Sequence, residues 1–133
     1  MTRQPGKAPN QRQLRVGEEL RHALAQLMER TDFRDPALEG VSVTVTEVRV
    51  SPDLRNATAF VIPLGGGDVG LVVKGLMRVR TFLRRELGRE VRLQFVPNLS
   101  FEPDRSFERA QHIEALLHSP QVLRDVRGDE DED

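Results

Sequence analysis

Two short valine-rich segments joined by a tight turn limit the possible folds of this chain more than any other feature. In residues 41–50 the first three valines alternate with Ser or Thr, which predicts a strand with one buried face. The last two valines change parity, so we expect a β-bulge near Thr46 and Glu47. Turn-forming residues at 51–56 lead to a second apolar segment at 57–62. So short a connection predicts an antiparallel pair.

The remaining elements follow from apolar spacing. Residues 12–30, 69–88 and 105–118 repeat apolar residues at helical spacing and predict three helices. Asp68 is placed to cap the middle helix and Gly88 to end it. Residues 91–96 alternate and predict a third strand, which Pro97 closes. A strand–helix–strand connection of this length allows the second and third strands to pair in parallel.

The element order is therefore helix–strand–strand–helix–strand–helix. It predicts an α+β fold of two layers, in which helices cover one face of a small three-stranded mixed sheet. The 133 residues suit one folded domain, which we place at 11–119. We expect a disordered arm at 1–10 and a disordered, solubilising acidic tail at 120–133.

The net charge of −1 conceals an uneven distribution. Residues 1–127 hold 20 basic and 16 acidic residues, whereas the last six residues hold five acids and no base. A basic body with an acidic tail is one of the asymmetries that point to nucleic acid.

Several function classes are excluded or disfavoured by what the sequence lacks. The chain has no Cys, so disulfides and thiolate metal sites are excluded. It has no apolar run of membrane-spanning length and no secretory signal, so we expect a cytoplasmic protein. His22, His112 and His118 have no carboxylates at a metal-ligand spacing and are interpreted as surface residues. No nucleophile or acid–base constellation is found, so we expect neither an enzyme nor a cofactor nor a small-molecule substrate.

A glycine-rich stretch at 65–70 invites comparison with phosphate-binding loops. A P-loop requires Lys followed by Ser or Thr directly after its last Gly, but here Leu71 follows Gly70. Residues 67–70 also match the Gly-x-x-Gly loop of KH domains, but that loop joins two helices, whereas this stretch follows a predicted strand. We interpret it as a flexible turn.

The middle helix carries the clearest functional signal. Lys74, Arg78, Thr81 and Arg85 are spaced to form one stripe, and no acid occurs from residue 69 to residue 85. A solvated helix face usually mixes charges of both signs, so the stripe indicates a polyanion about as strongly as it indicates a merely solvated face. The segment contains one aromatic residue, Phe82, so phosphate and 2′-hydroxyl contacts to structured RNA fit better than base stacking.

Four segments of the sequence occur together in an order typical of a known bacterial family. They are the first helix with Asp-Pro-Ala-Leu at 35–38, Val-Thr-Val-Thr-Glu-Val-Arg-Val-Ser-Pro-Asp-Leu at 43–54 followed by Ala-x-Ala-Phe-Val, Phe-Leu-Arg-Arg-Glu-Leu-Gly at 82–88 leading into 91–101, and residues 104–117. Through these segments, from about residue 12 to about residue 117, the sequence resembles bacterial ribosome-binding factor A.

The resemblance implies a type II KH-like domain in which an Ala-x-Gly kink between two helices replaces the Gly-x-x-Gly loop. That position is occupied here by Val79, Arg80 and Thr81, so β-branched residues stand where the family has Ala and Gly. The resemblance also implies a factor that binds the free or immature small ribosomal subunit and assists late maturation of its RNA, including processing of the 5′ end. It further implies a role in growth in the cold, without nuclease activity.

These inferences define a predicted RNA-binding set in a monomeric protein. Its members are Lys74, Arg78, Arg80, Thr81, Arg84, Arg85, Arg89 and Arg92, with Arg12 and Arg15 as weaker candidates. Two alternatives remain: a KH-like protein that binds structured RNA outside the ribosome, and a protein-interaction module. The second would dock through the sheet face that carries Ser42, Thr44 and Thr46, or through an edge strand.

Overall fold

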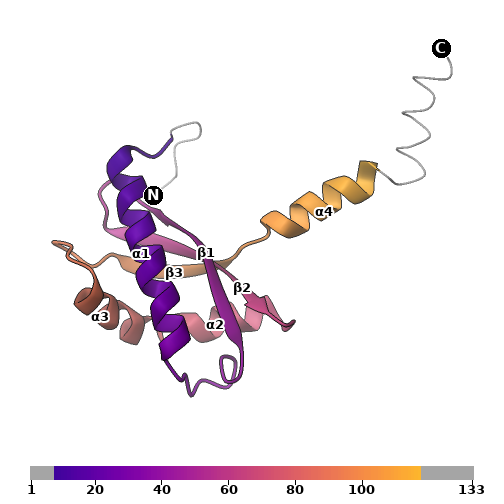
Figure 1. Ribbon diagram of the computed structural model, residues 1–133, viewed down its shortest axis with the longest axis horizontal. Helices are drawn as coiled ribbons and strands as arrows, with labels where there is room; N and C mark the ends of the chain where they lie inside the picture. The colour runs from indigo at the N-terminus through magenta and orange to yellow at the C-terminus, as the bar shows by residue number, and fades with distance from the viewer. Residues whose placement is uncertain (1–7, 118–133) are drawn as a thin grey trace, which may run out of the picture. The chain divides into compact units, whose positions relative to one another are not determined.

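The computed structural model describes residues 8–117 (Figure 1). It contains two compact units, residues 1–103 and 104–133, and each is described by itself. The expectations for most of the N-terminal arm, for His118 and for the acidic tail lie outside the described residues.

The first helix, α1 (Gln11–Arg30), begins at a capping box. Asn10 Oδ1 accepts a hydrogen bond from Gln13 N at 2.8 Å, and Gln13 Oε1 accepts one from Asn10 N at 3.0 Å. These bonds supply partners to N–H groups that a helix start leaves unsatisfied. Gln13 Nε2 also donates to Val50 O at 3.0 Å, which ties the start of α1 to the end of the first strand.

The sheet has the predicted mixed pairing. The strands β1 (Ser42–Val50) and β2 (Asn56–Leu64) pair antiparallel, and the register shifts between Val45 and Glu47, which confirms the expected bulge. The third strand, β3 (Asn98–Pro103), pairs with β2 in parallel, so the order in space is β1-β2-β3.

The prediction of the third strand at residues 91–96 is wrong. Those residues form a loop in which Val91, Leu93 and Val96 pack partly against the core, so their apolar spacing reflects packing without strand pairing. Proline has no N–H to donate to a strand ladder, and pairing begins just after Pro97. There Asn98 N donates to the carbonyl of Arg55 at 2.8 Å.

The predicted middle helix is kinked into two helices, α2 (Val69–Arg78) and α3 (Arg80–Glu90). Asp68 caps α2 as predicted, because its Oδ1 accepts a hydrogen bond from Gly70 N at 2.8 Å. The prediction that Gly88 ends the helix is wrong, since α3 continues past it to Glu90. The last helix, α4 (Ser106–Leu117), forms where a helix was predicted and belongs to the second unit.

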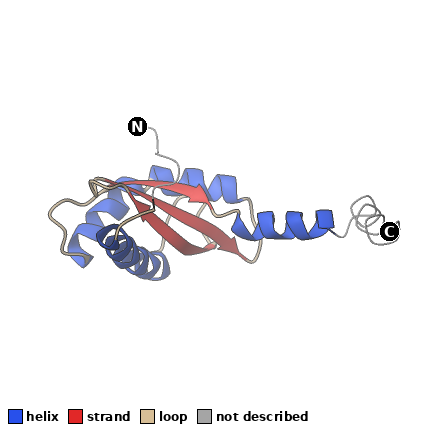
Figure 2. Cartoon of the chain, turned by 90° about the horizontal axis from the view of Figure 1, so that it is seen from above, coloured by secondary structure: helices blue, strands red, loops and turns tan. Residues whose placement is uncertain are grey.

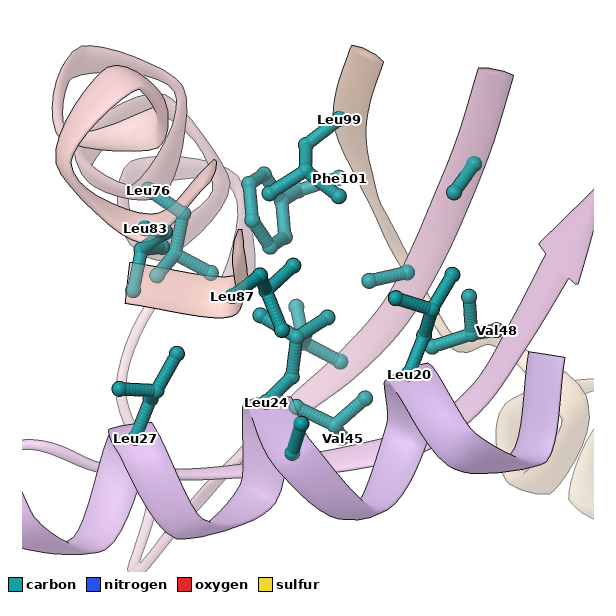
Figure 3. Packing of buried hydrophobic residues seen from close by; sticks show 14 of the residues in the cluster. Leu20, Leu24, Leu27, Val45, Val48, Leu76, Leu83, Leu87, Leu99 and Phe101 are labelled. Atoms are coloured by element: carbon teal, nitrogen blue, oxygen red, sulfur yellow. The ribbon is translucent and has the colours of Figure 1, made fainter. Parts of the chain in front are cut away.

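The core lies between one face of the sheet and the helices α1, α2 and α3 (Figures 2 and 3). The opposite face of the sheet is mixed: it carries Phe60 and Ile62 as well as polar residues, and there Thr58 Oγ1 and Ser100 Oγ lie 3.1 Å apart. This arrangement confirms the predicted two-layer α+β fold. Buried side chains of the two layers include Leu20, Leu24, Leu27, Leu76, Leu83, Leu87, Val45, Val48, Val61, Leu99 and Phe101.

Candidate nucleic-acid interface

The break between α2 and α3 lies at Val79. Its backbone has φ −102° and ψ 10°, outside helical geometry, and its N–H is shared between the carbonyls of Gly75 and Leu76 at 3.2 and 3.1 Å. No side chain caps the start of α3. The β-branched Val therefore stands at a helix break without Gly, with Arg80 and Thr81 exposed directly after it.

Three basic side chains near this break are exposed and lack an acidic partner. Lys74 lies on α2, and Arg80 and Arg85 lie on α3. Within residues 8–117, no carboxylate is within ion-pair distance of any of the three. The Arg85 guanidinium carbon lies 5.8 Å from the centre of the Phe82 ring, and Arg80 Nη1 lies 4.0 Å from Met77 Sδ. Their charges are therefore available to an external anion.

Arg78 is engaged within the protein. Its Nε and Nη2 donate to Asp35 Oδ2 and Oδ1 at 2.7 and 2.8 Å, and the Asp35 side chain is only 9% exposed. The Arg78 hydrogen bonds, with a further one from Ala37 N, lower the pKa of Asp35 to about 2. The basic stripe is thus partly neutralised by an acid that precedes it by 43 residues.

Arg84 and Arg89 also have partners. Arg84 Nη2 donates to Val96 O at 2.8 Å, and its Nε lies 3.2 Å from the carbonyls of Val96 and Pro97. Arg84 therefore holds the loop that leads into β3. Arg89 Nε lies 3.9 Å from Glu86 Oε2, but its side chain is 74% exposed, so the charge stays accessible to solvent.

The remaining predicted residues are not brought to the helix break. Arg12 and Arg15 lie in the first turns of α1, which Gln13 ties to Val50 at the end of β1. The helix break at Val79 is tied to the segment before β1 through the Arg78–Asp35 pair. The nine residues of β1 therefore separate the helix break from the start of α1 with Arg12 and Arg15. Arg92 lies in the loop after α3, where it lines a shallow depression with acidic and polar groups of α1 and α3.

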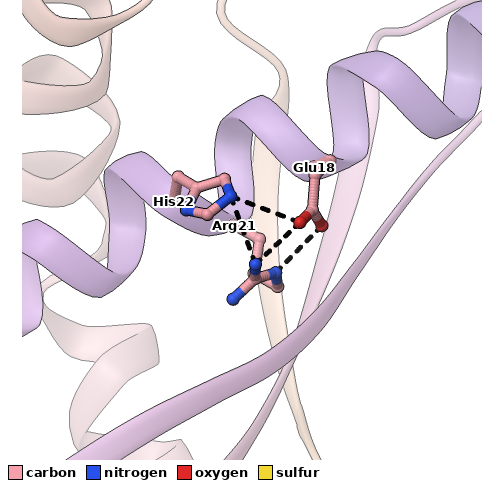
Figure 4. Close-up of polar contacts among 3 residues, drawn as sticks. All are labelled: Glu18, Arg21 and His22. Atoms are coloured by element: carbon pink, nitrogen blue, oxygen red, sulfur yellow. Dashed lines mark hydrogen bonds and ion pairs between the residues drawn. The ribbon is translucent and has the colours of Figure 1, made fainter.

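His22 belongs to a small polar cluster on α1. On α1, Arg21 Nη2 and His22 Nε2 lie 2.7 and 3.3 Å from Glu18 Oε2 (Figure 4). The hydrogen bond from Arg21 holds the pKa of Glu18 below its usual value. Among residues 8–117, no group of three or more His, Asp or Glu is arranged to hold a metal ion, and no helix has the length and hydropathy to cross a membrane.

Sequence reasoning missed two features of this surface. Asp35 is not among the predicted site residues, because nothing local in the sequence links it to Arg78, which lies 43 residues further along the chain. Phe95 was assigned to a strand, yet its side chain is 55% exposed and lies over Arg55 from the turn between β1 and β2. Gln94 and Phe95 are both exposed, so the alternation of the segment stops there, and only the structure shows this.

Comparison with known proteins gives a consistent result. The family model described as ribosome-binding factor A matches residues 12–117. Ribosome-binding factor A of Paramagnetospirillum magneticum is 58% identical over 120 residues, which cover 90% of this chain and 84% of the relative. The corresponding protein of Rhodospirillum rubrum is 56% identical over 126 residues, which cover 95% of this chain and 77% of the relative.

Solved structures agree with these matches. The crystal structure of ribosome-binding factor A from Thermus thermophilus is 28% identical, with a TM-score of 0.60, and the match covers 71% of this chain and 97% of that one. A Thermus thermophilus model fitted into a cryo-EM map of a complex with the 30S subunit is 29% identical, with a TM-score of 0.54. It matches 67% of this chain and 91% of that one. On its family-model match, sequence identity and fold, the chain belongs to the ribosome-binding factor A family.

Proposed function

We propose that this protein is an assembly factor that binds the free or immature small ribosomal subunit. It does so as a monomer in the cytoplasm, and its main contact is between subunit RNA and the exposed basic groups around Val79. The observation that carries the proposal is the set of three exposed basic side chains, Lys74, Arg80 and Arg85, that have no carboxylate partner among the described residues. The curated relatives named ribosome-binding factor A, and the relative fitted into a 30S complex, support the choice of ligand.

A neutralised variant tests this contact surface. In a chain with Lys74→Gln, Arg80→Gln and Arg85→Gln, we expect co-sedimentation with small subunits to weaken. Each phosphate contact contributes roughly 0.7–0.9 to the slope of log affinity against log salt, so the slope should fall by about 2. Arg84 is left unchanged, because its hydrogen bonds to the carbonyls of Val96 and Pro97 hold a loop, so its loss would disturb the fold.

A matched control uses three basic residues that do have acidic neighbours. Arg21, Arg49 and Arg105 pair with Glu18, Glu47 and Glu108, so changing all three to Gln removes the same charge from locally balanced sites. The control should bind nearly as tightly as the unmodified protein. Equal weakening of both variants would contradict the site, and association that persists after the RNA is digested would favour docking to a protein.

A further part of the proposal concerns what the bound factor does. It assists late maturation of small-subunit RNA, including processing of the 5′ end, and its contribution is largest in the cold. The protein acts by binding and has no catalytic role in this scheme. The match to the ribosome-binding factor A family supports the role in maturation. The sequence offers no acid–base or nucleophilic constellation, which is why the scheme assigns the protein no catalytic step.

A further inference from the structure

Phe95 is exposed at a position where the alternation of the loop would bury it. Val91 and Leu93 turn toward the core, and Phe95 has the same parity, yet its side chain is 55% exposed. Val96 and the fully buried Pro97 take the inward positions instead. The core therefore does not account for an aromatic residue at this position.

The exposed ring is paired with an arginine that the fold holds in place. The Arg55 guanidinium carbon lies 5.0 Å from the centre of the Phe95 ring, within the range of a cation–π contact. Arg55 O accepts a hydrogen bond from Asn98 N at 2.8 Å, and Arg55 N donates to Asp53 Oδ1 at 3.1 Å. The backbone of Arg55 is thus held between the turn before β2 and the first residue of β3, and its guanidinium reaches the Phe95 ring.

The turn that carries Arg55 is closed by hydrogen bonds and contains one residue in a left-handed conformation. Ser51 O accepts from Leu54 N at 2.8 Å, and Ser51 Oγ donates to Asp53 Oδ1 at 2.6 Å. Leu54 has φ 62°, a left-handed conformation that residues other than Gly rarely adopt and that is concentrated at ligand sites. The hydrogen bonds to Asp53 also hold its pKa below the usual value, so this carboxylate is directed into the turn.

A second pair of this kind shows what distinguishes Phe95. The Arg49 guanidinium carbon lies 5.2 Å from the Phe60 ring on the open sheet face. Phe60 is half-buried, and the residues beside it in register on the neighbouring strands are Glu47 and Glu102. Both rings carry an arginine, but the carboxylates on both sides of Phe60 would repel a phosphate backbone, and the Phe95 ring is the more exposed of the two.

Basic residues without acidic partners lie at the same end of the first unit. The first turn of α1, which carries Arg12 and Arg15, is joined to Val50 through Gln13. Val50 directly precedes the turn that presents Arg55. No described carboxylate lies within ion-pair distance of Arg12, Arg15 or Arg55, although the Asp53 carboxylate interacts with the charge of Arg55 at longer range. Aromatic rings beside exposed cations are the arrangement with which proteins bind single-stranded nucleic acid.

We propose that Phe95 and Arg55 bind an unpaired RNA base, which stacks on the exposed ring while Arg12 and Arg15 contact the adjoining phosphates. This second contact rests on the proposed function, because it takes the ligand to be RNA of the small subunit. It adds single-stranded RNA to the structured RNA met by the basic groups around Val79. The proposed contact also assigns an RNA ligand to Arg12 and Arg15, which lie near the end of β1 and away from the helix break.

The absence of Trp and Tyr from the chain allows a direct test. Phe95→Trp introduces the sole indole, and stacking of a base on it should quench its fluorescence when small subunits are added. The matched control is Phe60→Trp, which places the indole in the other Phe–Arg pair and should not be quenched. We further expect Phe95→Ala to weaken binding about 5-fold or more, the effect typical of losing one base–aromatic contact.

The outcomes separate this contact from the function on which it rests. Failure of the unmodified protein to co-sediment with small subunits would overturn the proposed function itself. A Phe95→Trp protein that co-sediments with unchanged emission would overturn the base contact alone. Phe95→Leu separates a base from an apolar protein surface: Leu keeps the apolar volume and loses the flat ring, so full binding by this variant also overturns the base contact.

Discussion

Gly17 shows how one residue sets the distance between the two layers. It is buried in α1, and a Cβ atom placed on it would lie 2.6 Å from the carbonyl oxygen of Val48 in β1. Real Cβ atoms do not approach that closely, and the obstacle is backbone, which cannot rotate away. The helix therefore packs directly on the strand at this point, as only Gly permits.

We expect Gly17→Ala to lower the free energy of unfolding by about 1–3 kcal/mol, the usual cost of overpacking. Urea denaturation followed by circular dichroism measures the change. Gly88→Ala is the matched control within α3, because its Cβ would meet a side-chain methyl, Val96 Cγ2 at 3.3 Å, and not backbone. That variant should lose less stability than Gly17→Ala, because Ala favours the helix over Gly by about 1 kcal/mol. Equal losses in both variants would refute the packing argument.

At the scale of elements, the Asp35–Arg78 pair fixes the end of α2 against the segment between α1 and β1. Gly75 permits the approach, because a Cβ on it would lie 3.0–3.1 Å from Leu38, Ala37 and Asp35. The pair is bidentate and the carboxylate is largely buried, which distinguishes it from the exposed Arg49–Glu47 pair. It therefore stabilises the position of the helix break.

This pair predicts a pH dependence of stability. The folded protein lowers the pKa of Asp35 from 3.8 to about 2, so its contribution is complete above about pH 4 and is lost as the pH falls toward 2. Arg78→Gln should therefore lower the urea midpoint at pH 7, and the difference from the unmodified protein should shrink between pH 4 and pH 2. Arg49→Gln, at the exposed pair, should change little at either pH. A pH-independent difference for Arg78→Gln would contradict the assignment.

The third strand and the loop before it illustrate where element prediction fails. Residues 91–96 and 98–103 both alternate, with Val91 and Leu93 in one segment and Leu99 and Phe101 in the other turned inward. Alternation reports burial of every second side chain and does not report backbone hydrogen bonds. The pairing of Asn98 with Asn56 decides which segment is the strand, and that partner lies 42 residues away.

At the scale of the whole molecule, seven of the ten residues in the predicted RNA-binding set fall into two regions and a structural group. Lys74, Arg80 and Arg85 lie around the helix break, whereas Arg12 and Arg15 lie at the opposite end of β1. Arg78 and Arg84 hold neighbouring segments of the fold. The first unit thus presents basic side chains at two separated places, which fits an RNA ligand long enough to contact both.

The proposed role in maturation predicts a cellular phenotype. Cells without the protein should accumulate small-subunit RNA with an unprocessed 5′ end, more strongly in the cold, as primer extension would show. The unmodified gene should correct the defect, and the Lys74, Arg80 and Arg85 triple Gln variant should not. The Arg21, Arg49 and Arg105 triple variant serves as control and should correct it. Normal 5′ ends in the absence of the protein would count against this role, while leaving subunit binding open to the sedimentation test.

The sequence by itself determined the first and last helices, the helical character of the segment from residue 69, the first two strands with their bulge, and the mixed two-layer fold. These features depend on periodicity and turn chemistry, which act between residues close in the chain. It also indicated the family and the basic middle helix. Only the tertiary structure decided that Asp35 neutralises Arg78, that Arg84 supports a loop, and that Phe95 faces outward beside Arg55. Arg78 and Phe95 each lie some 40 residues from their partners, and such distant pairings are set by packing of the whole chain, which local patterns do not encode.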